Sequence, residues 1–446
     1  MNSFYKRALT LALPIAMHSL IISSINMADV FMIGQLGETS IAALGISNQL
    51  MFMLILFLFG VSSGGQIFIA QFFGKNDKKN QDRVVGIMLI PALIISIAVM
   101  LGATIFPRAI MSVFSNDTSV LDQSASYLMI VGMSYPFTAI SFVFNTTCRS
   151  TDRPRFPMYT SFAALCINIF LNWVLIFGNL GFPALGIEGA AIGTLIARIM
   201  ETIFTLVLIY NSTSRARAKL KNMFDFKLDL TLRVARTSLP VFINEVTWAG
   251  GILALNIIFA RLGTQSIATI NIMDSVGRLS FAAFIGIAHA GGVILGQDMG
   301  AGKIDKVWED SKRFSFLAVG IGIVMAILLG IFAPNIVSIY SISETVFNYA
   351  VKTIRVWALI LPLVAFNCLN IVGILRSGGD TKAALWIDIG ALWAVGVPLA
   401  ILGAFYLELP IYLVYLMAKV EEVIKFILGT HRYFSKKWIK NLVEEF

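Results

Sequence analysis

The stretch SINMADVFMIG, residues 24–34, places the carboxylate of Asp29 inside the first long apolar run of the chain. An ionisable group at membrane depth costs roughly 3 kcal/mol or more, and such groups usually mark ion or substrate pathways. Asn26 lies about one turn before Asp29, on the same helical face. We therefore expect Asp29 to be a functional residue, provided that this run crosses a membrane.

The composition of the whole chain indicates that it does. The 446 residues are 57% hydrophobic and 13% charged, with a mean hydropathy of +0.82. A soluble protein of this length could not bury so much apolar surface, so the chain is predicted to be a polytopic membrane protein. Its net charge of +9 is explained by basic loops at a membrane surface, so we expect no nucleic-acid partner.

Apolar runs long enough to cross the hydrocarbon as helices occur twelve times, at about 20 residues per crossing. Alternation typical of strands is absent, which predicts an all-α fold of twelve transmembrane helices. The predicted spans are 8–34, 44–73, 84–106, 124–148, 157–178, 187–210, 237–262, 266–295, 314–337, 346–375, 383–405 and 409–430.

The loops between these spans differ sharply in basic residues. The segments assigned to one side hold 26 of the 34 Lys and Arg residues, and the loops of the other side hold only Arg108 and Arg261. By the positive-inside rule both termini are predicted to be cytoplasmic, in a cytoplasmic (inner) membrane. The longest basic segment, 211–236, is interpreted as a solvated cytoplasmic linker between an N-terminal lobe, 1–210, and a C-terminal lobe, 237–446.

The two predicted lobes are an internal repeat with an offset of 226 residues. Pro14 falls on Pro240, and residues 36–42 fall on residues 262–268; later, Arg149 recurs as Arg376, one residue out of register. Six spans per repeat give both halves the same orientation, so two six-helix bundles should be related by a pseudo-twofold axis along the membrane normal. Transporters built from such repeats alternate access by rocking one half against the other.

Polar residues within the spans suggest where a coupling cation binds. In span five, Asn168 and Asn172 are four residues apart and share a helical face, although such amides also commonly join membrane helices by hydrogen bonds. With Asp29 they would form an oxygen-rich nest for a hard monovalent cation. In the repeat register Glu245 corresponds to Ser19 rather than to Asp29, so it is predicted to belong to a second, different site.

Other intramembrane charges have simpler interpretations. Arg198 with Glu201 and Lys419 with Glu422 are predicted to be structural pairs, whereas the sequence offers no partner for Asp388. Asp152 and Asp380 are interpreted as turn and helix-cap residues. Pro14 interrupts the hydrogen bonding of span one, and a bend there is a natural gate for the Asp29 site. No nucleophile–base constellation or phosphate-binding loop is present, so we expect a transporter rather than an enzyme.

These motifs together resemble the multidrug and toxic compound extrusion (MATE) family over nearly the whole chain. The similar pieces are residues 28–34, 149–152, 185–191, 245–247 and 376–380. The resemblance implies a monomeric antiporter that expels small organic, often cationic, compounds across the lipid bilayer, coupled to Na⁺ or H⁺ and without other cofactors. It also implies a cation site in the N-terminal lobe, formed by Asp29, Asn168, Asn172 and Thr194, with sodium bound by the first three.

For the C-terminal lobe the resemblance implies a site around Glu245. The family's acidic residue in span ten falls near Ala365 in this chain, with Asn367 and Asn370 close by and Asp388 as a substitute. An alternative function is a flippase for a lipid-linked saccharide or an exporter of a specific metabolite. A flippase of this kind should line its cavity with Arg and Lys, which here fall mostly in loops.

Overall fold

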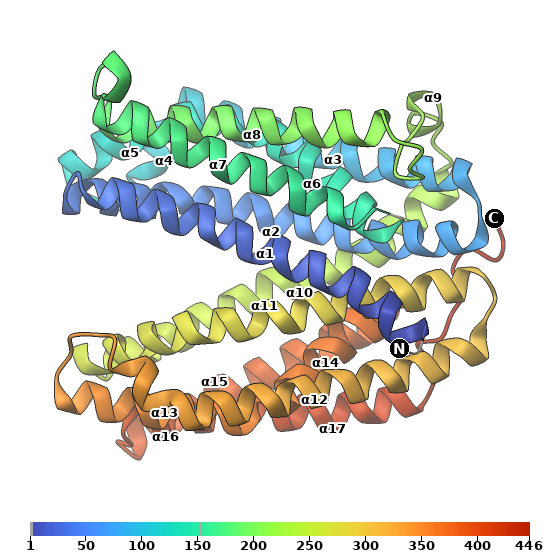
Figure 1. Ribbon diagram of the computed structural model, residues 1–446. Helices are drawn as coiled ribbons and strands as arrows, with labels where there is room; N and C mark the ends of the chain where they lie inside the picture. Colours follow the sequence, from blue (N-terminus) through green and yellow to red (C-terminus); the bar gives the residue numbers. More distant parts are fainter. Residues whose placement is uncertain (1–2, 152) are drawn as a thin grey trace. The chain divides into compact units, whose positions relative to one another are not determined.

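The computed structural model describes residues 3–151 and 153–446, with no account of the Ser3 and Leu279 side chains. Asp152, an expected cap residue, therefore lies outside the described residues. The described part of the chain is helical and contains no strand (Figure 1). It forms two compact units. We call Met17–Phe73 with Asp77–Ser238 the N-terminal bundle, and Met1–Ala16 with Gly74–Asn76 and Leu239–Phe446 the C-terminal bundle.

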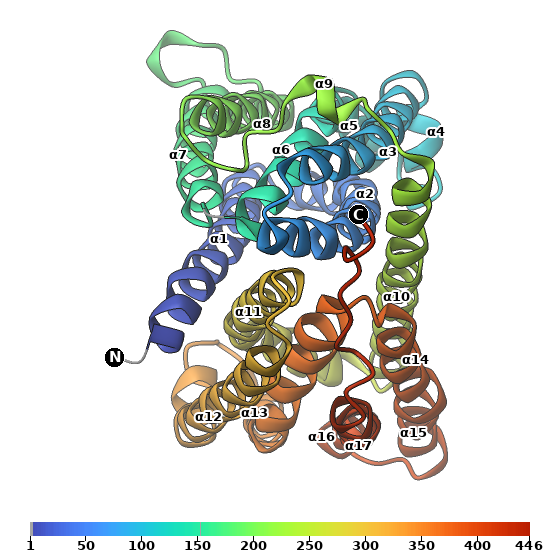
Figure 2. The same cartoon turned by 90° about the vertical axis from the view of Figure 1, so that its right-hand side faces the viewer.

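The N-terminal bundle is built from long apolar helices joined by short turns. α7 and α8 pack along one another, as do α3 and α6 (Figure 2). Its elements are α1 (Ser3–Gly34) from Met17 onward, α2 (Glu38–Lys75), α3 (Lys78–Ile105), α4 (Pro107–Met111), α5 (Thr118–Gly132), α6 (Tyr135–Ser150), α7 (Arg155–Phe177), η1 (Asn179–Gly181), α8 (Gly186–Tyr210), α9 (Leu220–Met223) and the start of α10 (Leu228–Arg261).

The C-terminal bundle contains the start of α1, the rest of α10 and the remaining elements. Three π-helical segments, η2, η3 and η4, interrupt its α-helices. The elements are α11 (Thr264–Gly300), α12 (Ile304–Val337), α13 (Glu344–Cys368), η2 (Leu369–Leu375), α14 (Thr381–Ala391), η3 (Leu392–Gly396), α15 (Val397–Ile401), η4 (Leu402–Tyr406), α16 (Ile411–Ala418) and α17 (Val420–Phe434).

Each of the twelve predicted spans corresponds to a helix or to consecutive helices. Ten helices of the described chain are long and apolar enough to cross a membrane. The span predicted at 124–148 is α5 followed by α6, bent by 51°, and brings the number to eleven. The span predicted at 409–430 is divided into α16 and α17 at Lys419, where charged residues are concentrated. The predicted all-α polytopic fold is confirmed.

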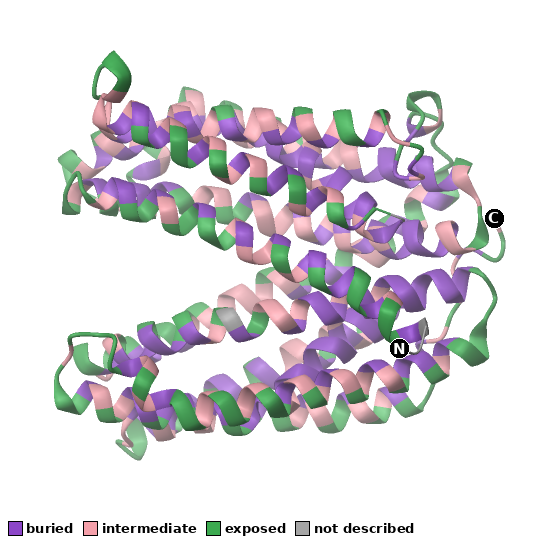
Figure 3. Ribbon diagram, in the orientation of Figure 1, coloured by how far each residue is buried: buried purple, intermediate pink, exposed green. Residues whose placement is uncertain are grey.

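Burial in the C-terminal bundle follows the membrane pattern. α12 carries exposed apolar residues along its length, as expected for a surface that faces lipid (Figure 3). The span formed by α13 and η2 is mostly buried. Its residues pack against α11, where an added methyl group on Gly292 would come within 3.2 Å of the Gly373 carbonyl oxygen. Small residues thus allow these two helices to approach closely.

The basic linker is not solvated throughout, contrary to the expectation from its charge. Ala216, Ala218 and Met223 are fully buried. Gln81 of α3 donates to the Arg215 carbonyl oxygen at 2.7 Å, and Arg83 forms an ion pair with Asp225. Backbone groups and apolar side chains therefore attach the segment to α3, although its charged tips remain exposed. From residue 228 onward it is already part of α10.

The division into membrane lobes that end at residue 210 and begin at residue 237 stays a prediction. The two compact units divide within α10, between Ser238 and Leu239, and the described residues from Ser3 to Ala16 belong to the C-terminal bundle. There, Phe4, Ala8, Leu11 and Ala12 of α1 join the apolar core formed with α11 and α12. The helix α1 therefore contributes its beginning to one bundle and its remainder, including Asp29, to the other.

Candidate functional site

Four predicted residues of the N-terminal bundle meet at one place inside it. Asp29 of α1 is 7% exposed, and Asn168 and Asn172 of α7 are fully buried. The Nδ2 of Asn172 donates to Oδ1 of Asp29 at 2.6 Å. The Nδ2 of Asn168 donates to Oγ1 of Thr194, on α8, at 3.3 Å. The structure thus brings together the complete N-terminal set that the sequence predicted.

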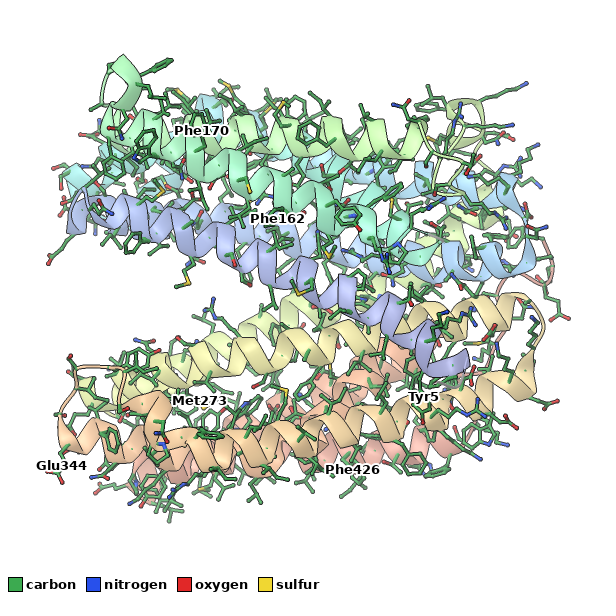
Figure 4. The ribbon with its side chains drawn as sticks, viewed as in Figure 1. Tyr5, Phe162, Phe170, Met273, Glu344 and Phe426 are labelled. Carbon is green, nitrogen blue, oxygen red and sulfur yellow. The ribbon has the colours of Figure 1, made fainter. Side chains whose placement is uncertain are left out.

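The two faces of α7 explain why its asparagines point inward. Phe162 and Phe170 are exposed by more than half and face away from the bundle (Figure 4). Asn168 and Asn172, one turn apart, occupy the opposite, buried face. Gly193 of α8 lies directly against Oδ1 of Asn172, where a side chain would overlap the amide. The absence of a side chain at Gly193 therefore makes room for Asn172 beside Asp29.

The site leaves oxygen atoms unused. The Oδ1 atoms of Asn168 and Asn172 are buried and have no hydrogen-bond partner. A buried acceptor left unsatisfied costs about 1–3 kcal/mol, so a pair of them beside a carboxylate needs an explanation. One carboxylate, two amide oxygens and a neighbouring hydroxyl are the oxygen ligands that hard cations take in proteins. These residues fit a bound monovalent cation.

Sequence reasoning missed one member of the site and correctly identified a neighbouring pair. Tyr127 of α5 is buried, and its hydroxyl lies close to the Thr194 side chain. No spacing pattern connects Tyr127 with the other residues, so the sequence carried no signal for it. Arg198 forms the predicted pair with Glu201, 2.8 Å apart, and Ser161 donates to the same carboxylate at 2.6 Å.

Pro14, the predicted bend, lies inside a helix that runs without interruption from Ser3 to Gly34. It removes one backbone hydrogen bond from α1, two residues before α1 leaves the C-terminal bundle at Ala16. Around this point α1 packs tightly on α11: a methyl group on Gly286 would lie 2.9 Å from the Ala12 carbonyl oxygen. A gating role for Pro14 stays a prediction.

The acidic residues predicted for a C-terminal site already have cationic partners. Oε1 of Glu245 lies 3.0 Å from Nη2 of Arg376. Oδ1 of Asp388 lies 2.9 Å from Nζ of Lys425, and its Oδ2 accepts from Asn244 at 3.0 Å. The partner of Asp388, which the sequence did not reveal, is therefore a lysine of α17.

The predicted C-terminal amides have separate surroundings. Asn367 donates to Oε2 of Glu422 at 2.8 Å, whereas both polar atoms of the Asn370 side chain lack partners and its amide adjoins Gly429. Lys419 pairs with Glu421, at 3.2 Å, instead of the predicted Glu422. The break between α16 and α17 at Lys419 changes the i, i+3 geometry on which that prediction rested. A cation site of Glu245, Asn367, Asn370 and Asp388 stays a prediction. In this structure three of these four side chains contact other residues instead of converging on one point, and Asn370 has no hydrogen-bond partner.

Comparison with known proteins decides the family. The MatE family model matches residues 14–174 and 240–402, once in each half of the internal repeat. The chain belongs to the MatE family. The uncharacterized transporter YisQ of Bacillus subtilis is 24% identical over 93% of this chain and 90% of its own length. The probable multidrug resistance protein NorM of Thermotoga maritima is 23% identical, covering 98% of this chain and 94% of its own.

Solved structures share the fold of this MatE chain. A structure described as MATE in the bent conformation has a TM-score of 0.87 and 18% identity, covering 98% of this chain and 97% of its own. A transporter of the MOP superfamily from Pyrococcus furiosus, whose title refers to reverse polarity of its binding pocket, has a TM-score of 0.86 and 19% identity over 97% and 96%. Its family makes this chain a multi-pass membrane transporter, whose named relatives are transporters and not enzymes.

Proposed function

We propose that this MatE protein exports small organic compounds, cationic or amphipathic, in exchange for sodium ions. The observation that supports this proposal is the pair of unpartnered amide oxygens on Asn168 and Asn172, beside the Asp29 carboxylate. Relatives that cover nearly the whole chain are named probable multidrug resistance proteins.

The donor set favours sodium over a proton as the coupling ion. A proton on Asp29 would supply a single O–H donor, which can satisfy at most one of the two amide oxygens and leaves the other unsatisfied at about 1–3 kcal/mol. A sodium ion would take all of these oxygens as ligands and neutralise the carboxylate at the same time. The buried face of α7 and the space at Gly193 would hold these ligands in place before the ion arrives.

Ion binding would be linked to transport through α1. Asp29 and Pro14 are on the same helix, and α1 belongs partly to each bundle. A bend at Pro14 would move Asp29 relative to Asn172 and change the affinity for the ion, which is what an antiporter requires of its coupling site. We further propose both termini in the cytoplasm, a rocking of the two halves for alternating access, a cytoplasmic-membrane location and a monomeric state.

The test is uptake of a fluorescent organic cation into inverted membrane vesicles, with sodium and pH gradients imposed separately. We expect a sodium gradient to drive transport and Asp29→Asn to abolish the sodium-driven part. Asp122→Asn is the matched control, because Asp122 is exposed and forms a surface ion pair with Arg108. If only a pH gradient drove transport, the coupling ion would be a proton instead of sodium. If Asp29→Asn kept its sodium-driven transport, the proposed mechanism would be refuted.

A further inference from the structure

Two arginines that correspond in the internal repeat have different surroundings. In the C-terminal bundle, Arg376 is 3% exposed and forms an ion pair with Glu245. Its counterpart in the N-terminal bundle is Arg149, at the end of α6, and the counterpart of Glu245 is Ser19. The second half therefore neutralises this arginine with a carboxylate, whereas the first half has an uncharged residue at the corresponding position.

No other acidic side chain of the described residues compensates for this difference. The Nη2 of Arg149 donates to Oγ1 of Thr146, a neutral hydroxyl on its own helix, at 2.9 Å. The Nε of Arg149 is buried and has no hydrogen-bond partner. Arg198, in contrast, is neutralised by Glu201. Among the ion pairs of the described residues, none involves Arg149.

A second group without a partner lies near Arg149. His18 of α1 corresponds to Asn244 in the repeat and precedes Ser19. Its side chain is 6% exposed, and its Nε2 has no hydrogen-bond partner. The His18 ring experiences the positive charges of both Arg149 and Arg198, and of these two arginines Arg149 is the one without a carboxylate partner among the described residues. In the other half the counterparts of these two residues both contact carboxylates: Arg376 contacts Glu245 and Asn244 contacts Asp388.

The guanidinium of Arg149 is only partly exposed and its Nε is buried without a partner, an arrangement that an accompanying anion would stabilise. Its planar fork of donors matches a carboxylate or a phosphate group, each of which accepts two parallel hydrogen bonds. A neutral imidazole that carries its proton on Nε2 would add a further donor. Because the Arg149 side chain is partly exposed while His18 is buried, a ligand can approach from the Arg149 side.

We propose that Arg149 and His18 form an oxyanion-binding site in the N-terminal bundle, which receives the carboxylate or phosphate of a small ligand. The ligand group replaces the carboxylate that Glu245 supplies in the other half. If the ligand is cargo, the exported compounds include amphipathic acids or zwitterions besides simple cations. The statement about exported compounds rests on the proposed export function, whereas binding of the oxyanion does not.

The test measures the unfolding midpoint of the purified protein in neutral detergent with benzoate, with the uncharged analogue benzamide, and with inorganic phosphate. We expect benzoate or phosphate to raise the midpoint by about 2 °C or more at saturation, and benzamide to have no effect. Arg149→Gln should abolish the shift. Ser19→Glu should also abolish it, because it restores an internal carboxylate, and should raise the midpoint of the free protein.

Two further arms identify the source of the anion. Lys352→Gln is the matched control, because it removes an exposed cation at another place and should keep the benzoate shift. A shift with phosphatidylglycerol but not with benzoate or phosphate would assign the site to a lipid headgroup. Absence of any shift in the wild type, or its appearance only in Asp152→Asn, would overturn the proposal. Because the assay needs no transport, its failure is distinguishable from that of sodium coupling.

Discussion

A single methyl group should disable the proposed sodium site without unfolding the protein. In Gly193→Ala, the new Cβ would overlap Oδ1 of Asn172, which is the nearest atom to that position. Because Oδ1 and Nδ2 belong to one rigid amide, moving the oxygen also moves the donor that contacts Asp29 at 2.6 Å. The variant therefore tests the ligand geometry and leaves the carboxylate itself unchanged.

The size of the effect follows from the bond that is lost. A hydrogen bond to a charged group contributes about 1.5–3 kcal/mol. With about 1.4 kcal/mol per factor of ten, sodium affinity should fall by roughly 10- to 150-fold. Alanine is a better helix former than glycine by about 0.5–1 kcal/mol, which partly offsets the lost hydrogen bond, so the free energy of unfolding should fall by about 0.5–2.5 kcal/mol.

Binding of radioactive sodium to the purified protein measures this affinity directly. Gly320→Ala is the control, since no atom lies within 4 Å of a Cβ added there; it should bind sodium as the wild type does. If the effect acts through Asn172, adding Gly193→Ala to Asn172→Ala should cause no further loss. Wild-type sodium affinity in Gly193→Ala would refute the assignment of Asn172 as a ligand.

Three further outcomes concern other parts of the molecule. Glu245→Gln should destabilise the protein by about 3–5 kcal/mol, because it leaves Arg376 buried without a charged partner. The double variant Glu245→Gln/Arg376→Met should recover most of the lost stability. Chemical unfolding monitored by fluorescence compares the two variants. Trp438→Ala should lower the free energy of unfolding by about 3–5 kcal/mol in the same assay, since this side chain is fully buried and stacks on Tyr433. A loss below about 1 kcal/mol would show that the C-terminal tail does not pack on the bundle. The hydrogen bond from Arg83 holds the pKa of Asp225 below its ordinary value, so attachment of the linker to α3 should be constant above about pH 4 and weaken as the pH falls through the lowered native pKa. Hydrogen exchange of the linker amides checks this, and Arg83→Gln should reduce the pH dependence to the part that Lys79 supports, because Lys79 also pairs with Asp225 at 3.5 Å.

The residues of the N-terminal site were predictable because the relevant information is local. Asn168 and Asn172 share a face of one helix, and Asp29 is conspicuous in an apolar run. The resemblance to a known family then connected three helices that spacing alone could not. Tyr127 escaped prediction because a buried tyrosine in a membrane helix is ordinary until its hydroxyl is seen against Thr194.

The C-terminal residues show the limit of such reasoning. The sequence indicated that Asp388 and Glu245 are costly, but their partners Lys425 and Arg376 lie 37 and 131 positions away. No helical periodicity relates residues on different helices, so only tertiary packing decides which charges meet. The same holds for Lys419, whose predicted partner was wrong because the helix breaks at that residue.

The sequence by itself determined the membrane fold and the repeat, and it singled out the residues that we propose as the coupling site. Hydrocarbon tolerates only internally hydrogen-bonded helices, so length and apolar composition suffice to predict the spans. Only the tertiary structure decided which buried polar groups are satisfied. It left two amide oxygens beside Asp29 and a guanidinium nitrogen at Arg149 without partners, because pairing depends on distances between helices that no one-dimensional pattern encodes.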